Sequence, residues 1–287
     1  MMNSLVLVAA GEGTRIGGSI NKLLMEMHGH PLIWYTFKNI LDSKLLDEIV
    51  IVVKDTEKSQ FQQILSEFKH AIPIKWGQGG NTRVDSVING ISQISSKSEK
   101  LLIHDGARPL VGGDAIDQIL NKLGPAHPAV IFALPCIDTM KEINDEQVKK
   151  TVDRSKLYRA QTPQGVLTDL YKKALLQIKS LENITDDSSI FEAVKIPVTI
   201  IPGRENFFKV TTTEDWNRFL SVVQTDKEGN RLNAVKKDGV SSSDEKVIGK
   251  RLQEIAKNAT TGGLYTQVGE LYGFPIKVVS ERILKEG

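Results

Sequence analysis

A glycine-rich segment near the start of the chain carries two cations at a spacing that suits a polyphosphate. Gly11 and Gly13 allow backbone N–H groups to approach phosphate oxygens closely, and Arg15 and Lys22 add two positive side chains. A dinucleotide-binding fingerprint is excluded because Ile16 stands where a third small residue is needed, and a P-loop is excluded because its Gly-Lys-Ser/Thr ending is missing. We therefore expect a polyphosphate site, with solvated cations on an ordinary turn as the alternative.

A second glycine-rich turn opens a later helix. Residues 77–86, with the sequence GQGGNTRVDS, place Arg83 and Ser86 in the first turn of that helix. The N–H groups of a helix N-terminus and a nearby positive charge can hold an anion or the edge of a base. An ordinary connection between a strand and a helix explains the glycines equally well.

An aspartate ends a predicted strand at 100–105. Sheets built from parallel strands bind ligands at the C-terminal ends of those strands, so Asp105 is well placed to hold Mg²⁺ against phosphate oxygens. Arg108 follows three residues later and can take a substrate phosphate. The alternative is that Asp105 caps the next helix, but that helix is expected to begin nearer Gly113.

Several polar residues of the second half of the chain have two interpretations each. Thr162 precedes a proline in a segment, 158–165, that we expect to be a loop. Thr185 or Asp186 is expected to begin a helix, and capping alone explains both. Lys209 interrupts an apolar run, and both an exposed strand edge and a position facing a cleft fit it.

Strand and helix patterns alternate along the chain and predict an α/β fold. Short runs rich in Val and Ile indicate buried parallel strands, and the segments between them have helical periodicity. We expect a mostly parallel sheet with helices on both faces. Strands are expected at 5–10, 48–53, 72–75, 100–105, 129–134, 198–201 and 206–210, and helices at 31–41, 57–68, 113–123, 213–222 and from about residues 83 and 168.

The pattern changes at 138–153, where two alternating arms flank a polar turn at 144–145 and predict a β-hairpin. A hairpin that stands off a sheet needs a partner to cover it. We therefore expect an arm, at about 137–155, that forms a homodimer and reaches the other subunit's site with Thr139 and Arg154. A solvated charge at a strand edge is the alternative for Arg154.

Composition limits the class of protein. The 287 residues include 37 Lys and Arg against 35 Asp and Glu, so a net charge of +2 gives no overall field for nucleic acid or an anionic membrane. No apolar run approaches the ~20 residues of a membrane span, and no targeting segment precedes the first strand, so we expect a cytoplasmic protein. The five histidines show no zinc-ligand spacing, and the single cysteine cannot form an intrachain disulfide.

These segments, taken in order, resemble the 2-C-methyl-D-erythritol 4-phosphate cytidylyltransferase family of non-mevalonate isoprenoid synthesis. The resemblance spans about residues 3 to 222 and rests on AAGEGTR, NK, GGNTRVDS, HDGARP, ALP, DTMK, TVDR, AQTPQG, ITDD and FFKVT. It implies a Rossmann-like nucleotidyltransferase domain with a protruding β-arm that forms a homodimer. It also implies that CTP and the polyol phosphate give CDP-methylerythritol and pyrophosphate, with Mg²⁺ or another divalent cation as cofactor.

The resemblance implies roles for individual residues. By this resemblance, Arg15 and Lys22 hold the triphosphate and stabilise the transition state, and Asp105 binds the metal. The implied cytidine nucleotide site contains Gly11, Gly13, Gly80, Arg83 and Ser86, and Ala9, Ala10 and Gly106 are further substrate-binding positions. The implied polyol-phosphate or reaction-centre positions are Arg108, Thr139, Arg154, Thr162, Thr185, Asp186 and Lys209, of which Arg154 and Lys209 join the catalytic set.

The C-terminal part lies outside this resemblance. We expect a cytidylyltransferase domain at 1–223, a linker at 224–243 and an extension of unknown role at 244–287. Two alternatives remain for the domain: the same chemistry on ribitol 5-phosphate or another polyol phosphate, and a non-catalytic nucleotide-binding scaffold. A tail that tethers nucleic acid is a weaker idea, because the charges of the tail are mixed.

Overall fold

The computed structural model describes residues 2–11, 21–178, 180–181, 184–224 and 233–234. The chain divides into two units, and all of these residues lie in the first, Met1–Ala234. Gly13 and Arg15 fall outside the described residues. So do the predicted linker and extension, apart from residues 224, 233 and 234.

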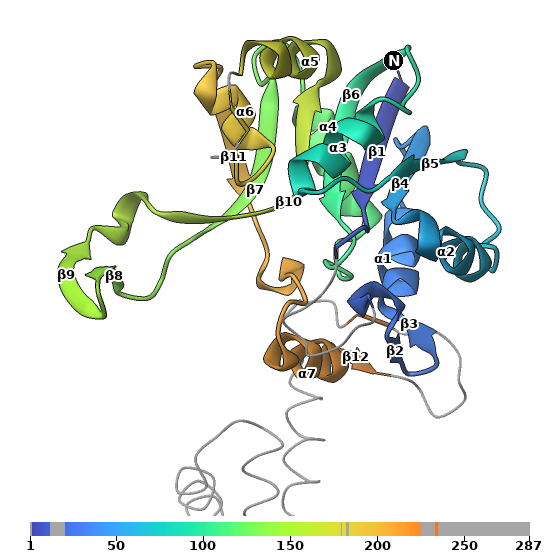
Figure 1. Cartoon of the computed structure of the whole chain (residues 1–287), viewed down its shortest axis with the longest axis horizontal. Helices are drawn as coiled ribbons and strands as arrows, with labels where there is room; N and C mark the ends of the chain where they lie inside the picture. The colour runs from blue at the N-terminus through green and yellow to red at the C-terminus, as the bar shows by residue number, and fades with distance from the viewer. Residues whose placement is uncertain (1, 12–20, 179, 182–183, 225–232, 235–287) are drawn as a thin grey trace, which may run out of the picture. The chain divides into compact units, whose positions relative to one another are not determined.

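A seven-stranded sheet forms the centre of this unit (Figure 1), in the order β11-β7-β10-β6-β1-β4-β5. Six strands run in one direction, and β10 is antiparallel to both of its neighbours. The prediction of a mostly parallel sheet is confirmed. The strands are β1 (Met2–Val8), β4 (Glu48–Val53), β5 (Ile74–Gln78), β6 (Ser98–Asp105), β7 (Ala129–Pro135), β10 (Tyr158–Leu167) and β11 (Val198–Pro202).

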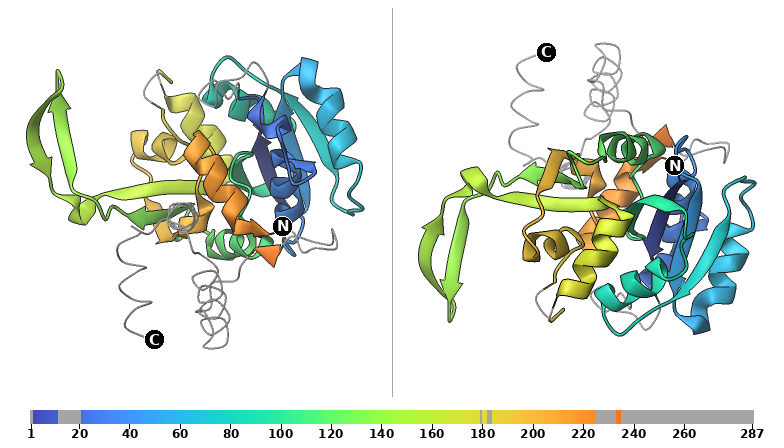
Figure 2. Two further views of the ribbon diagram at one scale, coloured as in Figure 1. Left: turned by 90° about the horizontal axis from the view of Figure 1, so that it is seen from below. Right: turned by 90° about the horizontal axis from the view of Figure 1, so that it is seen from above.

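Helices cover both faces of the sheet (Figure 2), as the alternating pattern predicted. The side chains of β1 alternate between the faces: Leu5 and Leu7 pack with α1, α2, α4 and α7, whereas Val6 packs with α3, α5 and α6. Two apolar cores therefore hold the sheet between them. The helices are α1 (Leu32–Ile40), α2 (Lys58–Leu65), α3 (Arg83–Ile91), α4 (Gly113–Lys122), α5 (Thr168–Gln177), α6 (Ser188–Ala193) and α7 (Thr213–Val222).

Short elements connect this framework. Single turns of 3-10 helix lie at Lys22–Leu24, Asp55–Glu57, Arg154–Lys156 and Glu205–Phe207. Two small hairpins pair β2 (Glu26–Met27) with β3 (His30–Pro31), and β12 (Val223–Gln224) with β13 (Asn233–Ala234). The strand β13 falls within the range predicted as a linker. Among the described helices, none has the length and apolarity needed to cross a membrane.

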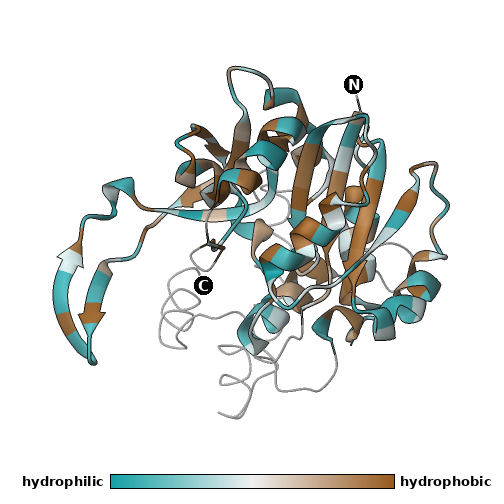
Figure 3. Ribbon diagram, turned by 45° about the horizontal axis from the view of Figure 1, so that its top comes forward, coloured by the Kyte–Doolittle hydropathy of each residue, from teal (hydrophilic) through white to brown (hydrophobic). Residues whose placement is uncertain are grey.

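The predicted arm is a hairpin of β8 (Met140–Asn144) and β9 (Gln147–Val152), which stands away from the main sheet (Figure 1). Asp145 and Glu146 at its turn have φ values of 46° and 65°, the left-handed backbone that tight hairpins require. Apolar residues remain uncovered on and beside the arm (Figure 3): Ile137, Met140, Ile143, Val148 and Tyr158 are all exposed. The arm thus carries an exposed apolar surface that no other described part of the chain covers.

The loop predicted at 158–165 is wrong, because these residues belong to β10, which lies between β6 and β7. Gln161, Thr162 and Gln164 are buried within this strand, and their hydrogen bonds satisfy the polar groups. The ladder to β7 shifts register between Gln161 and Gln164. A buried strand with polar side chains and a proline gives neither an apolar run nor a regular alternation, so the sequence pattern missed it.

The strand predicted at 206–210 is also wrong. The segment begins with the 3-10 turn at Glu205–Phe207 and continues as irregular backbone. Phe207 and Val210 are fully buried, and the Val210 N–H donates to the Ala107 carbonyl at 2.8 Å. The apolar residues thus pack into the core without joining the sheet. Smaller differences affect the strand ends, since β1 ends at Val8 and β5 runs to Gln78.

Candidate active site

A cleft of about 610 Å³ opens where several parallel strands end. Its described lining contains four cations, Lys22, Lys54, Arg83 and Lys209, and one carboxylate, Asp105. This excess of positive charge suits a polyanionic ligand. The remaining lining residues are Val8, Ala10, Gly11, Leu23, Gly79, Gly80, Asn81, Thr82, Ser86, Gly106 and Ala107.

Small residues bring two turns close together on one wall of the cleft. The Gly79 N–H donates to the Val53 carbonyl at 2.8 Å, and a Cβ added to Gly79 would lie 2.5 Å from the Cβ of Ala10. A Cβ added to Gly80 would lie 2.2 Å from the Cβ of Asp85. Glycine is therefore required at both positions. Its absence of a side chain leaves the backbone of this wall open to a flat ligand such as a base.

The N-terminus of α3 is fixed by reciprocal hydrogen bonds. Thr82 and Asp85 form a capping box, which places Arg83 at the first helical position. The Gly80 N–H donates to Ser86 Oγ, and Ser86 Oγ donates to the Thr82 carbonyl, both at 3.0 Å. The hydroxyl of Ser86 thus shapes the glycine turn that lines the cleft.

Asp105 lies at the end of β6 among three basic side chains. Arg83 Nε is 3.1 Å from Oδ1, Lys209 Nζ is 3.1 Å from Oδ2, and Arg108 Nε is 3.5 Å from Oδ2. Burial alone would raise the pKa of Asp105, but the attraction of Lys209, Arg83 and Arg108 outweighs it and holds this pKa well below its usual range. Asp105 therefore carries a negative charge at every physiological pH.

Arg83 also contacts a second buried carboxylate, that of Asp187. Its Nη2 donates to Asp187 Oδ2 at 2.7 Å, and the Tyr171 hydroxyl donates to Asp187 Oδ1 at 3.2 Å. Burial raises the pKa of Asp187, and the Arg83 charge offsets part of that rise. The two carboxylates raise the pKa of Arg83 further above its ordinary value, although burial opposes this. A chain of polar contacts thus joins Tyr171 on α5, Asp187 before α6, Arg83 on α3 and Asp105 on β6.

Lys209 lines the cleft. Of the two positions that the sequence allowed, an exposed strand edge and a position facing a cleft, the structure has the second. The irregular segment around it is held to the loop after β6. Arg108 Nη1 donates to the Phe207 carbonyl at 2.7 Å, and the Val210 N–H donates to the Ala107 carbonyl at 2.8 Å. These bonds fix the backbone of Lys209, whose side chain keeps 36% of its surface exposed.

Thr162 on β10 forms a hydrogen bond with the backbone of Asp105. Its hydroxyl accepts the Asp105 backbone N–H at 3.1 Å and lies 3.1 Å from Nδ1 of His104. Burial lowers the pKa of His104 to about 3, so the imidazole is neutral. Its Nε2 has no hydrogen-bond partner among the described residues.

Asp186 and Thr185 lie at the start of α6. The helix begins at Ser188 after Asp187, so the predicted helix start at Thr185 or Asp186 is too early. The Asp186 carboxylate nevertheless accepts the Ser189 N–H at 3.0 Å and the Gln164 side-chain amide at 2.7 Å. Thr185 is exposed.

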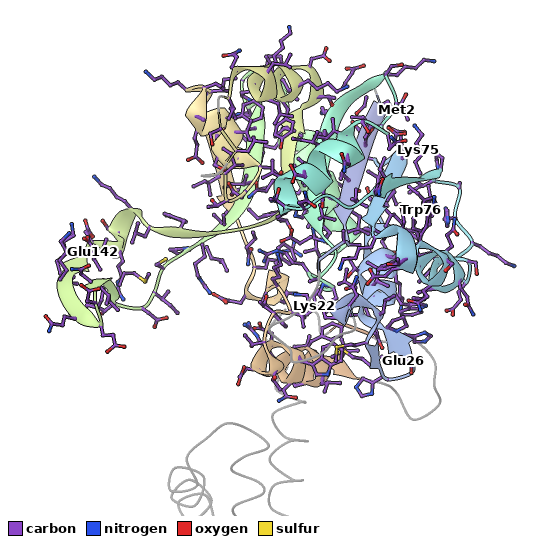
Figure 4. All side chains as sticks on the ribbon, viewed as in Figure 1. Met2, Lys22, Glu26, Lys75, Trp76 and Glu142 are labelled. Carbon is purple, nitrogen blue, oxygen red and sulfur yellow. The ribbon has the colours of Figure 1, made fainter. Side chains whose placement is uncertain are left out.

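The arm residues lie apart from the cleft of their own chain. Thr139 and Arg154 are exposed at the base of the hairpin, and Arg154 Nη1 donates to the Ile137 carbonyl. Figure 4, which labels Lys22 and Glu142, shows how far the arm extends from the cleft. Among the remaining predicted residues, Ala9 is fully buried beneath the cleft, whereas Gly13 and Arg15 lie outside the described residues.

Two charged residues escaped the sequence analysis. Lys54 directly follows the predicted strand at 48–53, so the rule that pointed to Asp105 would have found it. Asp187 follows Asp186 in the segment that was expected to begin a helix, and no separate role was predicted for it. No sequence signal distinguishes an aspartate that caps a helix from one that pairs with a distant arginine.

The described residues contain no group of three or more His, Cys, Asp and Glu side chains that could hold a metal ion alone. Asp105 is the only carboxylate in the described lining of the cleft. A hard divalent cation such as Mg²⁺ commonly binds through one carboxylate, with phosphate oxygens and water completing its coordination. The donor chemistry of Asp105 fits that mode, provided that the phosphates draw the basic side chains from one of its oxygens.

Comparison with known proteins gives a consistent result for most of the chain. The family model described as 2-C-methyl-D-erythritol 4-phosphate cytidylyltransferase matches residues 3–224. A protein of that description from Prochlorococcus marinus subsp. pastoris is 38% identical over 213 residues, covering 74% of this chain and 94% of the relative. One from Nostoc punctiforme is 35% identical, with 74% and 93% covered.

Solved structures agree with this result. The crystal structure of 4-diphosphocytidyl-2C-methyl-D-erythritol synthase from Anaerococcus prevotii is 29% identical and superposes with a TM-score of 0.66, covering 77% of this chain and 97% of that one. A second family model, described as a domain of unknown function, matches residues 220–287.

Proposed function

We propose, because the chain belongs to the 2-C-methyl-D-erythritol 4-phosphate cytidylyltransferase family, that the cleft around Asp105 binds CTP and this polyol phosphate together. Membership makes the chain a nucleotidyltransferase of isoprenoid precursor synthesis, which forms CDP-methylerythritol and pyrophosphate. The observation that carries the placement of this reaction is a single cleft whose described lining contains four cations and one carboxylate. The residue roles below are part of the proposal.

The reaction needs charge neutralisation rather than a general base. An oxygen of the substrate phosphate, already anionic, attacks the α-phosphorus of CTP and forms a new P–O bond. The bond from that phosphorus to the bridging oxygen breaks, and pyrophosphate leaves with the electron pair. Two polyanions must approach each other, so fixed positive charges lower the barrier. Lys22 supplies such a charge in the cleft, and we assign the same role to Arg15.

The cytidine half of CTP is proposed to bind at the turns after β1 and β5. Ala9, Ala10 and Gly11 follow β1, and Gly80, Arg83 and Ser86 follow β5. Gly106 after β6, and Gly13, which lies outside the described residues, are proposed to complete this site. The close approach of Gly79 to Ala10 supports the proposal, because a base fits against bare backbone. Base specificity would then come from N–H and carbonyl groups of the two turns.

Mg²⁺, or another divalent cation, is proposed to bind Asp105. The ion would neutralise negative charge on the triphosphate oxygens. Asp105 contributes one hard oxygen ligand, and Thr162 holds its backbone in place. Lys209 and Arg108, which contact the same carboxylate, are near enough to turn toward a phosphate when the substrates enter.

The polyol phosphate is proposed to bind beside Asp105, at Arg108, Thr162, Thr185, Asp186 and Lys209. We propose that Thr139 and Arg154 of a second copy complete this side in a homodimer joined through the arms. The uncovered Ile143 and Val148, 61% and 60% exposed, support the dimer because an arm with such a surface needs a covering partner. The cytoplasmic location expected from the sequence stays a prediction.

The test measures pyrophosphate release from CTP and Mg²⁺, with 2-C-methyl-D-erythritol 4-phosphate and ribitol 5-phosphate offered separately. Release with the erythritol substrate alone, lost in Lys22→Ala, supports the proposal. Preference for ribitol 5-phosphate would instead assign the protein to the alternative substrate. Failure to release pyrophosphate with either would contradict the proposal and favour a binding role.

A further inference from the structure

The two oxygens of Asp105 are held in different ways. Oδ1 receives Arg83 Nε at 3.1 Å, whereas Oδ2 receives Lys209 at 3.1 Å and Arg108 at 3.5 Å. Arg83 is itself held by the buried Asp187, and its side chain is 25% exposed. Lys209 carries its charge at the end of a flexible four-carbon stem, and its side chain is 36% exposed. The contact at Oδ1 is therefore the fixed one, and the contact at Oδ2 can be exchanged.

Asp187 determines how the guanidinium of Arg83 is turned. The guanidinium is a rigid plane, so the direction of Nη2 sets the direction of Nε. Asp187, only 2% exposed, takes Nη2 at 2.7 Å, and this leaves Nε for a single oxygen of Asp105. Nη1 is buried without a hydrogen-bond partner among the described residues, so the described polar contacts of Arg83 are those with the two carboxylates.

Removing the charge of Asp187 would change what Arg83 does. A buried guanidinium without its second partner seeks the nearest carboxylate, and arginine binds a carboxylate most strongly as a two-pronged fork. That carboxylate is Asp105. A forked contact would occupy both of its oxygens, including the one that Lys209 and Arg108 share.

We propose that Asp187 is a positioning residue, which holds Arg83 to Oδ1 of Asp105 and so keeps Oδ2 available for a divalent cation and the phosphates. The proposal rests on the proposed function, because it concerns how the same carboxylate serves that reaction. Asp187 touches neither substrate nor metal in this scheme. It acts through Arg83 alone.

The first experiment measures Mn²⁺ binding to the full chain in the presence of CTP by electron paramagnetic resonance, and pyrophosphate release with Mg²⁺ in parallel. In Asp187→Asn, which keeps the shape but removes the charge, we expect Mn²⁺ affinity and kcat each to fall about tenfold or more, with the KM for the polyol phosphate changed less than about threefold. The matched control is Tyr171→Phe, which removes the other hydrogen bond to the same carboxylate. It is expected to change either quantity less than about twofold.

The order of two Asp187 variants separates positioning by charge from simple packing. Asp187→Glu keeps the charge and alters the shape, so it should retain more Mn²⁺ affinity and more activity than Asp187→Asn. A packing role predicts the reverse order, since asparagine matches the volume of aspartate. That reverse order, or an unchanged Mn²⁺ affinity in Asp187→Asn, would overturn the proposal.

A double variant tests the route through Arg83. If Asp187 acts only through this side chain, Arg83→Gln combined with Asp187→Asn should bind Mn²⁺ as Arg83→Gln does alone. Independent, additive losses would overturn the proposal. Because this double variant removes Arg83 and the charge of Asp187 together, it leaves no unpaired guanidinium, and we expect it to fold even if Asp187→Asn alone does not. Failure of the proposed function would be seen separately, as a wild-type chain that releases no pyrophosphate while the Mn²⁺ comparison still stands.

Discussion

The cleft and the arm each contain a carboxylate that forms ion pairs with basic side chains. The ion pairs of the two regions differ in their exposure to solvent rather than in their distances. On the arm, Lys149 and Lys150 approach Glu142 to 2.7 Å and 3.0 Å. In the cleft, Lys209 approaches Asp105 to 3.1 Å, which is no closer. Yet the Asp105 side chain is 9% exposed and that of Glu142 is 36% exposed.

This difference shows that environment determines what an ion pair does. Hydrogen bonds from Lys149 and Lys150 lower the pKa of Glu142, but water and salt screen these exposed pairs. Asp105 is buried in the wall of the cleft, so Lys209, Arg83 and Arg108 act on it with less screening by water. The charged centre of the cleft is organised within one chain, whereas the arm makes its ion pairs at the surface, where the proposed second copy would cover it.

The largest expected effect distinguishes the lysines of the two regions. Lys209→Ala removes a cation from the reaction centre and should lower kcat/KM about 100-fold to 1,000-fold, the scale of a lost transition-state donor. Lys149→Ala removes a shorter ion pair from the arm and should leave kcat/KM nearly unchanged. Steady-state pyrophosphate release measures both. Similar losses in the two variants would show that distance, and not setting, governs these pairs.

The next effect concerns the apolar surface of the arm. Ile143→Asp places a charge on a residue that is 61% exposed and should give a monomer, with pyrophosphate release lowered about tenfold or more because the second copy's arm no longer completes the site. Leu176→Asp is the matched control, since Leu176 is 88% exposed on α5 and lies off the arm. Light scattering after size-exclusion chromatography reports the assembly. A dimeric, active Ile143→Asp variant would remove the arm from the proposed interface.

A smaller effect should appear in the pH dependence of stability. The folded-state pKa of His104 is about 3, below the ordinary value of an unfolded histidine, so the unfolded chain binds an extra proton between these values. The contribution of His104 to stability is therefore lost as pH falls from about 6.5 to 3, with a slope of up to about 1.4 kcal/mol per pH unit. The arm at 137–155 contains no histidine and cannot produce this slope.

Denaturant unfolding of the wild type and His104→Gln between pH 3.5 and 8 measures that slope. Both chains keep Asp105, whose depressed pKa lowers the stability of each as pH falls below about 5, so subtracting one curve from the other isolates the imidazole. The stability difference should be constant above pH 7 and should change steadily below it. Parallel curves throughout would show that the imidazole is not buried in neutral form.

The smallest expected effect comes from Glu142 itself. Glu142→Gln removes both ion pairs of the arm, but these pairs are solvated, so the midpoint of thermal unfolding should not change measurably at moderate salt. Asp105→Asn, measured in the same way, should shift it clearly because three cations lose their shared partner. A clear shift in Glu142→Gln, removed by high salt, would show that the arm pairs matter more than their exposure suggests.

Segments with a uniform apolar pattern were predicted closely from the sequence. The strand at 48–53 and the helix at 213–222 have the bounds that were expected, because every residue of the first is buried and the second begins with a capping box. The hairpin arm was also found, although its turn lies at residues 145–146, one position after the predicted 144–145. In these segments, neighbouring residues carry most of the information.

Contacts between distant segments could not be predicted in this way. The strand β10 was missed because its buried polar residues obtain partners from β6, the segment before α6 and the loop after β11. Asp187 was missed because its partner Arg83 lies 104 residues away. The family resemblance named Lys22, Arg83, Asp105 and Lys209, which the structure places around one cleft, but the sequence alone gave no reason for the Arg83 side chain to bridge two carboxylates.

The position of β10 also orders events in time as the chain is synthesised. The strands β1, β4, β5 and β6 can pair once residue 105 has emerged from the ribosome, but β6 keeps an open edge and β7 has no sheet partner until β10 follows. At 5–20 residues per second, this takes roughly 3 to 12 seconds. During that interval the apolar strand β7 and the nascent arm are exposed together. We therefore expect chaperone binding and misassembly of this protein to be most frequent while residues 105 to 167 are being translated.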